Sequence, residues 1–143
     1  MFITVQARNT YIMVFVCYHM SSHKLVDLLV LEDDSLFRKA ISFGFSSELS
    51  YVFVTCQDEL IDYLRTGNAL LYSLDDYVSK CYSSSPTSLF IQNYELIQQI
   101  DPGATVLYHG SSPSQQTTDF CLQHDVPMIS DRFSLGKLIT NYF

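Results

Sequence analysis

Residues 28–34 constrain the fold of this chain more than any other segment, because four consecutive apolar residues are followed there by three carboxylates. A short uninterrupted apolar run is typical of a strand buried on both faces of a parallel sheet. Acidic residues directly after such a strand lie at its carboxyl end, where open α/β sheets place their ligand sites. Residues 35–41 then show apolar side chains at helical spacing, with Asp34 or Ser35 available as N-cap. The pattern predicts the first strand–helix unit of an α/β domain with a metal-binding edge.

Strands and helices alternate through the rest of the chain. We expect further strands at residues 51–54, 69–74, 105–109 and 126–130. We expect further helices at residues 58–65, 94–100, 117–124 (capped by its threonine pair) and 133–143, and a long loop at 79–88. Alternating βα units predict a doubly wound five-stranded parallel sheet with helices on both faces, in a single domain.

Composition excludes several function classes. The net charge of −7 offers no basic patch for phosphates, so we expect no direct nucleic-acid binding. The apolar run at residues 11–18 is too short to span a bilayer, and we expect no membrane contact.

The four cysteines are scattered without a C-x-x-C pair, which is typical of isolated thiols in a cytoplasmic protein. His109 is expected to be a packed strand residue. The absence of a Gly-rich loop after the strands argues against a small flavodoxin-like or nucleotide-binding protein.

The first part of the chain differs from the rest. Residues 1–23 are expected to form an N-terminal extension or an added edge strand, and residues 24–143 the domain itself.

Three motifs of residues 24–143 resemble the response-regulator receiver domain of the CheY-like superfamily. They are Val30-Leu31-Glu32-Asp33-Asp34 with Leu36 and Arg38, Leu60-x-x-x-Leu64 followed eleven residues later by Asp75, and Phe133-Ser134-Leu135 with Lys137-Leu138. The resemblance implies the flavodoxin-like receiver fold with strand order 2-1-3-4-5. It also implies that Glu32, Asp33 and Asp75 hold Mg²⁺ and that Asp75 accepts a phosphoryl group. The alternative interpretation is a solvated acidic loop that only caps the first helix, with Asp75 as a relic or turn residue.

The chain departs from the receiver pattern at two switch positions. The family's lysine after the fifth strand is replaced by Asp131, followed by Arg132, and its serine or threonine after the fourth strand aligns with Gly110. An aspartate in place of the lysine exchanges a compensating positive charge for a repulsive negative one. The loop after Asp76 is also longer than usual by about ten residues. We therefore expect an atypical, degenerate receiver.

The resemblance implies a function in two-component-type bacterial signalling. We expect a non-enzymatic domain that acts through protein–protein contacts, forms a homodimer, and regulates an output domain such as a transcription activator. A histidine kinase would be a further partner. The alternative is a conventional phospho-accepting response regulator, with Asp75 as the phosphorylation site, Mg²⁺ on Glu32 and Asp33, and Arg132 in place of the lysine.

Overall fold

The computed structural model describes residues 2–7, 10–15, 24–76, 87–131 and 134–139. One sheet contains five parallel strands in the order β4-β3-β5-β6-β7. These strands are β3 (Lys24–Leu31), β4 (Tyr51–Val54), β5 (Gly67–Leu74), β6 (Thr105–His109) and β7 (Met128–Ile129). Counted from β3, the order is 2-1-3-4-5, as the sequence predicted.

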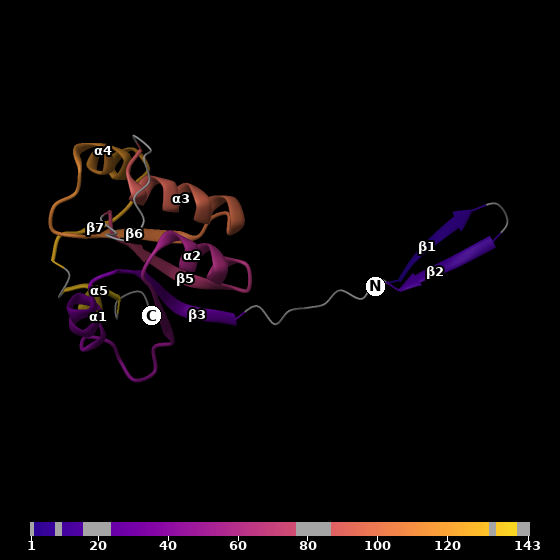
Figure 1. Ribbon diagram of the computed structural model, residues 1–143, viewed down its shortest axis with the longest axis horizontal. Helices are drawn as coiled ribbons and strands as arrows, with labels where there is room; N and C mark the ends of the chain where they lie inside the picture. Colours follow the sequence, from indigo (N-terminus) through magenta and orange to yellow (C-terminus); the bar gives the residue numbers. More distant parts are fainter. Residues whose placement is uncertain (1, 8–9, 16–23, 77–86, 132–133, 140–143) are drawn as a thin grey trace.

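The N-terminal residues form a separate antiparallel hairpin. Strand β1 (Phe2–Ala7) pairs with β2 (Thr10–Phe15) in a two-stranded sheet of their own. Neither strand belongs to the five-stranded sheet, whose outer strands are β4 and β7 (Figure 1). The hairpin lies within residues 1–23, for which the sequence predicted an N-terminal extension or an added edge strand, and that expectation stays a prediction.

Five helices cover the two faces of the main sheet (Figure 1). They are α1 (Ser35–Ser42), α2 (Gln57–Leu64), α3 (Leu89–Ile100), α4 (Gln115–Gln123) and α5 (Leu135–Ile139). Buried residues of α1 and α5 pack in one apolar cluster, and those of α2, α3 and α4 pack in another. The five α/β units thus form the doubly wound architecture that the alternation predicted. No described helix is long and apolar enough to cross a membrane.

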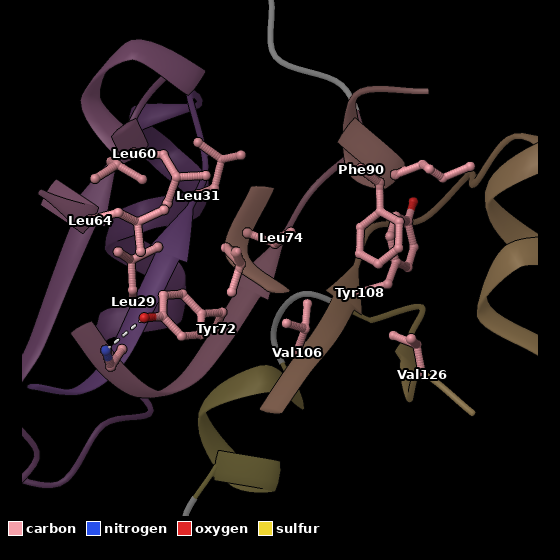
Figure 2. Packing of buried hydrophobic residues seen from close by; sticks show 14 of the residues in the cluster. Leu29, Leu31, Leu60, Leu64, Tyr72, Leu74, Phe90, Val106, Tyr108 and Val126 are labelled. Atoms are coloured by element: carbon pink, nitrogen blue, oxygen red, sulfur yellow. Dashed lines mark hydrogen bonds between the residues drawn. The ribbon is translucent and has the colours of Figure 1, made fainter. Parts of the chain in front are cut away.

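The apolar run before the carboxylates serves both faces of the sheet. Leu28 and Val30 belong to the cluster under α1 and α5, whereas Leu29 and Leu31 belong to the cluster on the other face. Figure 2 shows Leu29 and Leu31 in that larger cluster, close to Leu60 and Leu64 of α2. Side chains alternate between the faces of a strand, so an uninterrupted apolar run is needed where both faces are buried.

Several helix and strand boundaries differ from the prediction. Helix α3 begins at Leu89, not at residue 94, because Ser88 Oγ accepts a hydrogen bond from Ile91 N and starts the helix earlier. Helix α4 is capped by Ser114, whose Oγ accepts from Thr117 N, and not by the threonine pair. Strand β7 contains only Met128 and Ile129 of the expected 126–130. Most of the predicted loop at 79–88 and both ends of the predicted last helix lie outside the described residues.

Candidate functional site

The carboxyl ends of three neighbouring strands bring together Glu32, Asp75 and His109. The parallel register pairs Leu31 with Leu74 and Leu74 with Tyr108, so the residues that follow lie side by side. One ligand atom from each of the three side chains lies within 4.8 Å of the other two. The residues are 1%, 3% and 0% exposed, so the cluster is almost entirely removed from solvent. We refer to Glu32, Asp75 and His109 as the acidic pocket.

Glu32 is held by its own loop and by His109 at the end of β6, two strands away from β3. Its Oε1 accepts a hydrogen bond from Asp34 N at 3.1 Å, and its Oε2 lies 3.3 Å from His109 Nε2. The guanidinium of Arg38 donates from Nη1 to the carbonyl oxygens of Glu32 and Asp33, each at 2.8 Å. Arg38 therefore fixes the turn between β3 and α1 through the backbone and orients the Glu32 side chain into the acidic pocket.

The two other carboxylates after β3 have different positions. Asp34 is exposed and caps α1, with Oδ1 accepting from Leu36 N at 2.7 Å. Asp33 is partly buried and is not a member of the three-residue cluster. Of the predicted Mg²⁺ ligands, the structure brings Glu32 and Asp75 together, and His109 of β6, not Asp33, is the third member of the cluster.

Asp75 and Asp76 both follow β5, but their carboxylates form different contacts. Asp75 Oδ1 accepts from the Asp76 backbone N at 2.7 Å, and its side chain is part of the acidic pocket. The Asp76 carboxylate instead accepts from Thr117 Oγ1 at 2.8 Å and, at longer distance, from the backbone N of Ser114 and Phe90. Asp76 therefore ties the first turns of α3 and α4 to the end of β5, while Asp75 remains the carboxylate with a place in the pocket.

His109 was expected to be a packed strand residue, and it is indeed fully buried. It is also part of the acidic pocket, which the sequence analysis did not foresee. Its Nδ1 lies 2.7 Å from Ser73 Oγ on the adjacent strand, and its Nε2 faces Glu32. The position of His109 as the last residue of an apolar strand, at the same sheet edge as both acids, was the signal that could have identified it.

Gly110, at the first switch departure, has no room for a side chain. A methyl group there would overlap the hydroxyl of Tyr108 and approach Asp75 Oδ1 at 3.0 Å. Tyr108 is buried and its ring packs edge-to-face on Phe90, so it has little freedom to move aside (Figure 2). A serine or threonine at this position would therefore require rearrangement of the neighbouring side chains.

Asp131, at the second switch departure, is exposed at the start of the last helix. Its Oδ2 accepts a hydrogen bond from Ser134 Oγ at 2.6 Å, and its carbonyl oxygen accepts from Ser134 N. These two hydrogen bonds tie Asp131 to Ser134, directly before α5. Arg132 lies outside the described residues.

The acidic pocket fits a metal ion, but it fits Mg²⁺ only in part. The carboxylates of Glu32 and Asp75 are oxygen ligands of the kind Mg²⁺ uses. Mg²⁺ also keeps several water molecules, whereas the three side chains of the acidic pocket are almost completely buried. The imidazole of His109 is a ligand that suits Zn²⁺ and other transition metals better than Mg²⁺.

Comparison with known proteins supports the fold assignment. No protein-family model matches the chain, and no curated protein matches it. Among solved structures, the chain is similar to the phosphorylated cyanobacterial phytochrome response regulator RcpA, with a TM-score of 0.60 and 18% identity, over 84% of this chain and 91% of that chain. A structure fused to the yeast Spc42 trimeric coiled coil matches with a TM-score of 0.60 and 14% identity, over 84% of this chain and 76% of that chain. The predicted flavodoxin-like receiver fold is therefore confirmed.

Proposed function

We propose that the domain from β3 onward is an atypical receiver that acts through protein–protein contacts and regulates an output domain, such as that of a transcription activator. The observation that carries the proposal is the acidic pocket itself. Glu32 and Asp75 lie at the carboxyl ends of β3 and β5 of a receiver fold, which is where a receiver would hold its metal and phosphoryl group. The proposed role is that of a cytoplasmic binding module and not of an enzyme.

The atypical character rests on the residues that surround these carboxylates. Transfer of a phosphoryl group to a carboxylate depends on positive charge placed beside the developing negative charge. The receiver lysine is replaced by Asp131, whose carboxylate is engaged with Ser134. The end of β6 supplies an imidazole and a glycine where the family supplies a hydroxyl. Efficient use of Asp75 as a phosphoryl acceptor is therefore not expected.

A second candidate is a conventional phospho-accepting response regulator. The placement of Asp75 in the acidic pocket, with its Oδ1 held by Asp76 N, favours it. In this role Glu32 and Asp33 would hold Mg²⁺, and Arg132 would stand in for the lysine. Mg²⁺-dependent labelling with acetyl phosphate, read by intact mass, separates the candidates. Stoichiometric labelling that Asp75→Asn abolishes would select the conventional regulator.

A homodimer is part of the proposal, and exposed apolar side chains support it. Leu138 on α5 is 38% exposed and Met128 on the outer strand β7 is 37% exposed. Phe43, directly after α1, is 90% exposed, and α1 packs in the same apolar cluster as α5. A contiguous exposed apolar patch is typical of a surface that binds a partner, and the proposal is that these three side chains belong to one such patch. The other aromatic residues predicted for the last helix, Phe133, Tyr142 and Phe143, lie outside the described residues.

Light scattering of the purified chain tests the dimer. Leu138→Glu should shift the protein toward the monomer, because it places a charge in the proposed contact. Gln99→Glu is the control, because it adds the same charge at an exposed polar residue of α3, a helix that packs on the opposite face of the sheet from α5. A strict monomer at high concentration would contradict this part of the proposal.

A further inference from the structure

His109 is the member of the acidic pocket to which the receiver resemblance assigns no task. Its two ring nitrogens face different groups: Ser73 Oγ at 2.7 Å from Nδ1 and Glu32 Oε2 at 3.3 Å from Nε2. A hydroxyl can accept the proton of Nδ1, and Nε2 then presents a lone pair to the carboxylates. In that tautomer a cation between Nε2 and the carboxylates stabilises these facing electron-pair donors, whereas in the other tautomer Nε2–H donates directly to Glu32 Oε2.

The separation between Nε2 and Glu32 Oε2 matches that of two ligands of one metal ion. Nitrogen and oxygen ligands lie about 2.0–2.2 Å from Zn²⁺, so two ligands of a tetrahedral ion are about 3.3–3.6 Å apart. A direct charge-assisted hydrogen bond between an imidazolium and a carboxylate is shorter, at about 2.7–2.9 Å. The observed 3.3 Å is compatible with shared coordination of one ion and also with a long direct hydrogen bond between the two side chains.

We propose that Glu32, Asp75 and His109 bind a divalent transition-metal ion of the Zn²⁺ type in place of the Mg²⁺ that the receiver resemblance implies. One imidazole nitrogen and two carboxylate oxygens form a ligand set that such ions accept, with a fourth position for water or another group. Ser73 is the outer-shell partner that fixes the imidazole, as a hydrogen-bond acceptor on the second ring nitrogen does in known metal sites. The nearly complete burial of the three ligands favours an ion that gives up its water shell readily over Mg²⁺.

This inference deepens the proposed function, because it concerns the same pocket of the proposed receiver. Metal binding is measured without a phosphodonor and without a partner protein. Failure of the metal site would therefore leave the proposed protein-contact function standing, and failure of that function would leave the metal result intact.

The test is a titration of the full chain, freed of metal with a chelator, with Zn²⁺ and separately with Mg²⁺. We expect one Zn²⁺ per chain that depends on His109, and a Zn²⁺ affinity well above that for Mg²⁺. Ser73→Ala should weaken Zn²⁺ binding about 10- to 100-fold, because it removes the outer-shell partner. His109→Gln, which removes a ligand outright, should weaken it at least as much. The calorimetric stoichiometry and the metal-induced rise in Tm are the readouts.

The control is a variant in which the chain's other histidines, His19, His23 and His124, are replaced by Gln. It should bind Zn²⁺ like the unmodified chain. The proposal is overturned if His109→Gln binds Zn²⁺ as tightly as the unmodified chain, if the control loses the site, or if Mg²⁺ binds as tightly as Zn²⁺. Should His109→Gln fail to fold, the X-ray absorption spectrum of the Zn²⁺-loaded unmodified chain decides. Nitrogen and oxygen neighbours support the site, and sulfur neighbours would place the ion on the cysteines and refute it.

Discussion

Gly44 and Gly136 bring α1 and α5 into backbone contact. A methyl group on Gly136 would lie 2.7 Å from the Cα of Gly44, and one on Gly44 would lie 2.9 Å from the Cα of Gly136. Gly136 is buried on α5, and Gly44 stands in the turn that ends α1. The close approach lets α1 and α5 cover the same face of the sheet, around Ile41 and Leu135.

Gly136→Ala is expected to destabilise the domain. Alanine in a helix is normally favoured over glycine by up to about 1 kcal/mol. Here the added methyl group meets backbone atoms of Gly44, and overpacking of this kind costs about 1–3 kcal/mol. We expect a net loss in the free energy of unfolding, measured by denaturant titration. Lys137→Ala, at the exposed next position, should change it much less. A stabilised Gly136→Ala variant would show that the helices do not approach this closely.

Acetyl phosphate is expected to label Asp75 slowly or not at all. Loss of one well-placed donor to a transition state costs on the order of 3 kcal/mol, or about a hundredfold in rate. Asp131→Lys restores the positive charge of the receiver pattern and should raise the rate of labelling, read by intact mass. Asp131→Asn is the matched control, because it removes the negative charge without supplying a positive one. Rapid labelling of the unmodified chain would favour the conventional regulator instead.

Asp76→Ala is expected to loosen the first turns of α3 and α4. The Asp76 carboxylate accepts hydrogen bonds from Thr117 Oγ1 and from backbone N–H groups at the start of both helices. Loss of a capping carboxylate typically costs about 0.5–2 kcal/mol. Hydrogen exchange should become faster at the N-termini of α3 and α4. Asp119→Ala, an exposed carboxylate on α4, should leave these amides protected. Equal exchange in both variants would refute the anchoring role.

Ionisation of the buried Tyr72 hydroxyl is expected to destabilise the domain at high pH. Burial is the main cause that raises the pKa of its hydroxyl to about 12, and the nearby Asp101 carboxylate raises it further, while the hydrogen bond from Ala69 N opposes the change (Figure 2). In the unfolded chain the tyrosine hydroxyl ionises near pH 10. The free energy of unfolding that the neutral hydroxyl supports is therefore intact below that pH and falls as the pH rises toward 12. Tyr72→Phe should reduce this dependence, measured as the free energy of unfolding against pH. Tyr51→Phe, at an exposed tyrosine, is the control. An unchanged slope in Tyr72→Phe would contradict the prediction.

The sheet is well predicted from the sequence because successive side chains of its inner strands enter the apolar clusters on opposite faces, which requires uninterrupted apolar segments. Leu28 to Leu31 alternate between the faces, and all four are buried because both faces of β3 are covered. The start of α3 was missed since its cap, Ser88, directly follows a polar loop and a serine there is equally typical of that loop.

The candidate site was predicted in part. The placement of Glu32 and Asp75 follows from the rule that parallel strands bring their carboxyl ends together. The role of His109 does not, because a histidine at the end of an apolar strand is indistinguishable from a packed residue until its neighbour Ser73 and the facing carboxylate are known. For Asp131, the sequence analysis considered only the charge of the side chain. Its hydrogen bonds with Ser134 depend on a local turn that the charge does not reveal.

The shortness of the outer strands limits how other chains can join this domain. β4 has four residues and β7 has two, so these outer strands themselves offer few backbone groups for pairing. Long exposed edges are templates for strand addition and for aggregation, and short ones protect against both. Association of this domain with another copy or with a partner is therefore expected to rely on side chains of the helices, and a peptide that binds by extending the sheet would find little to pair with.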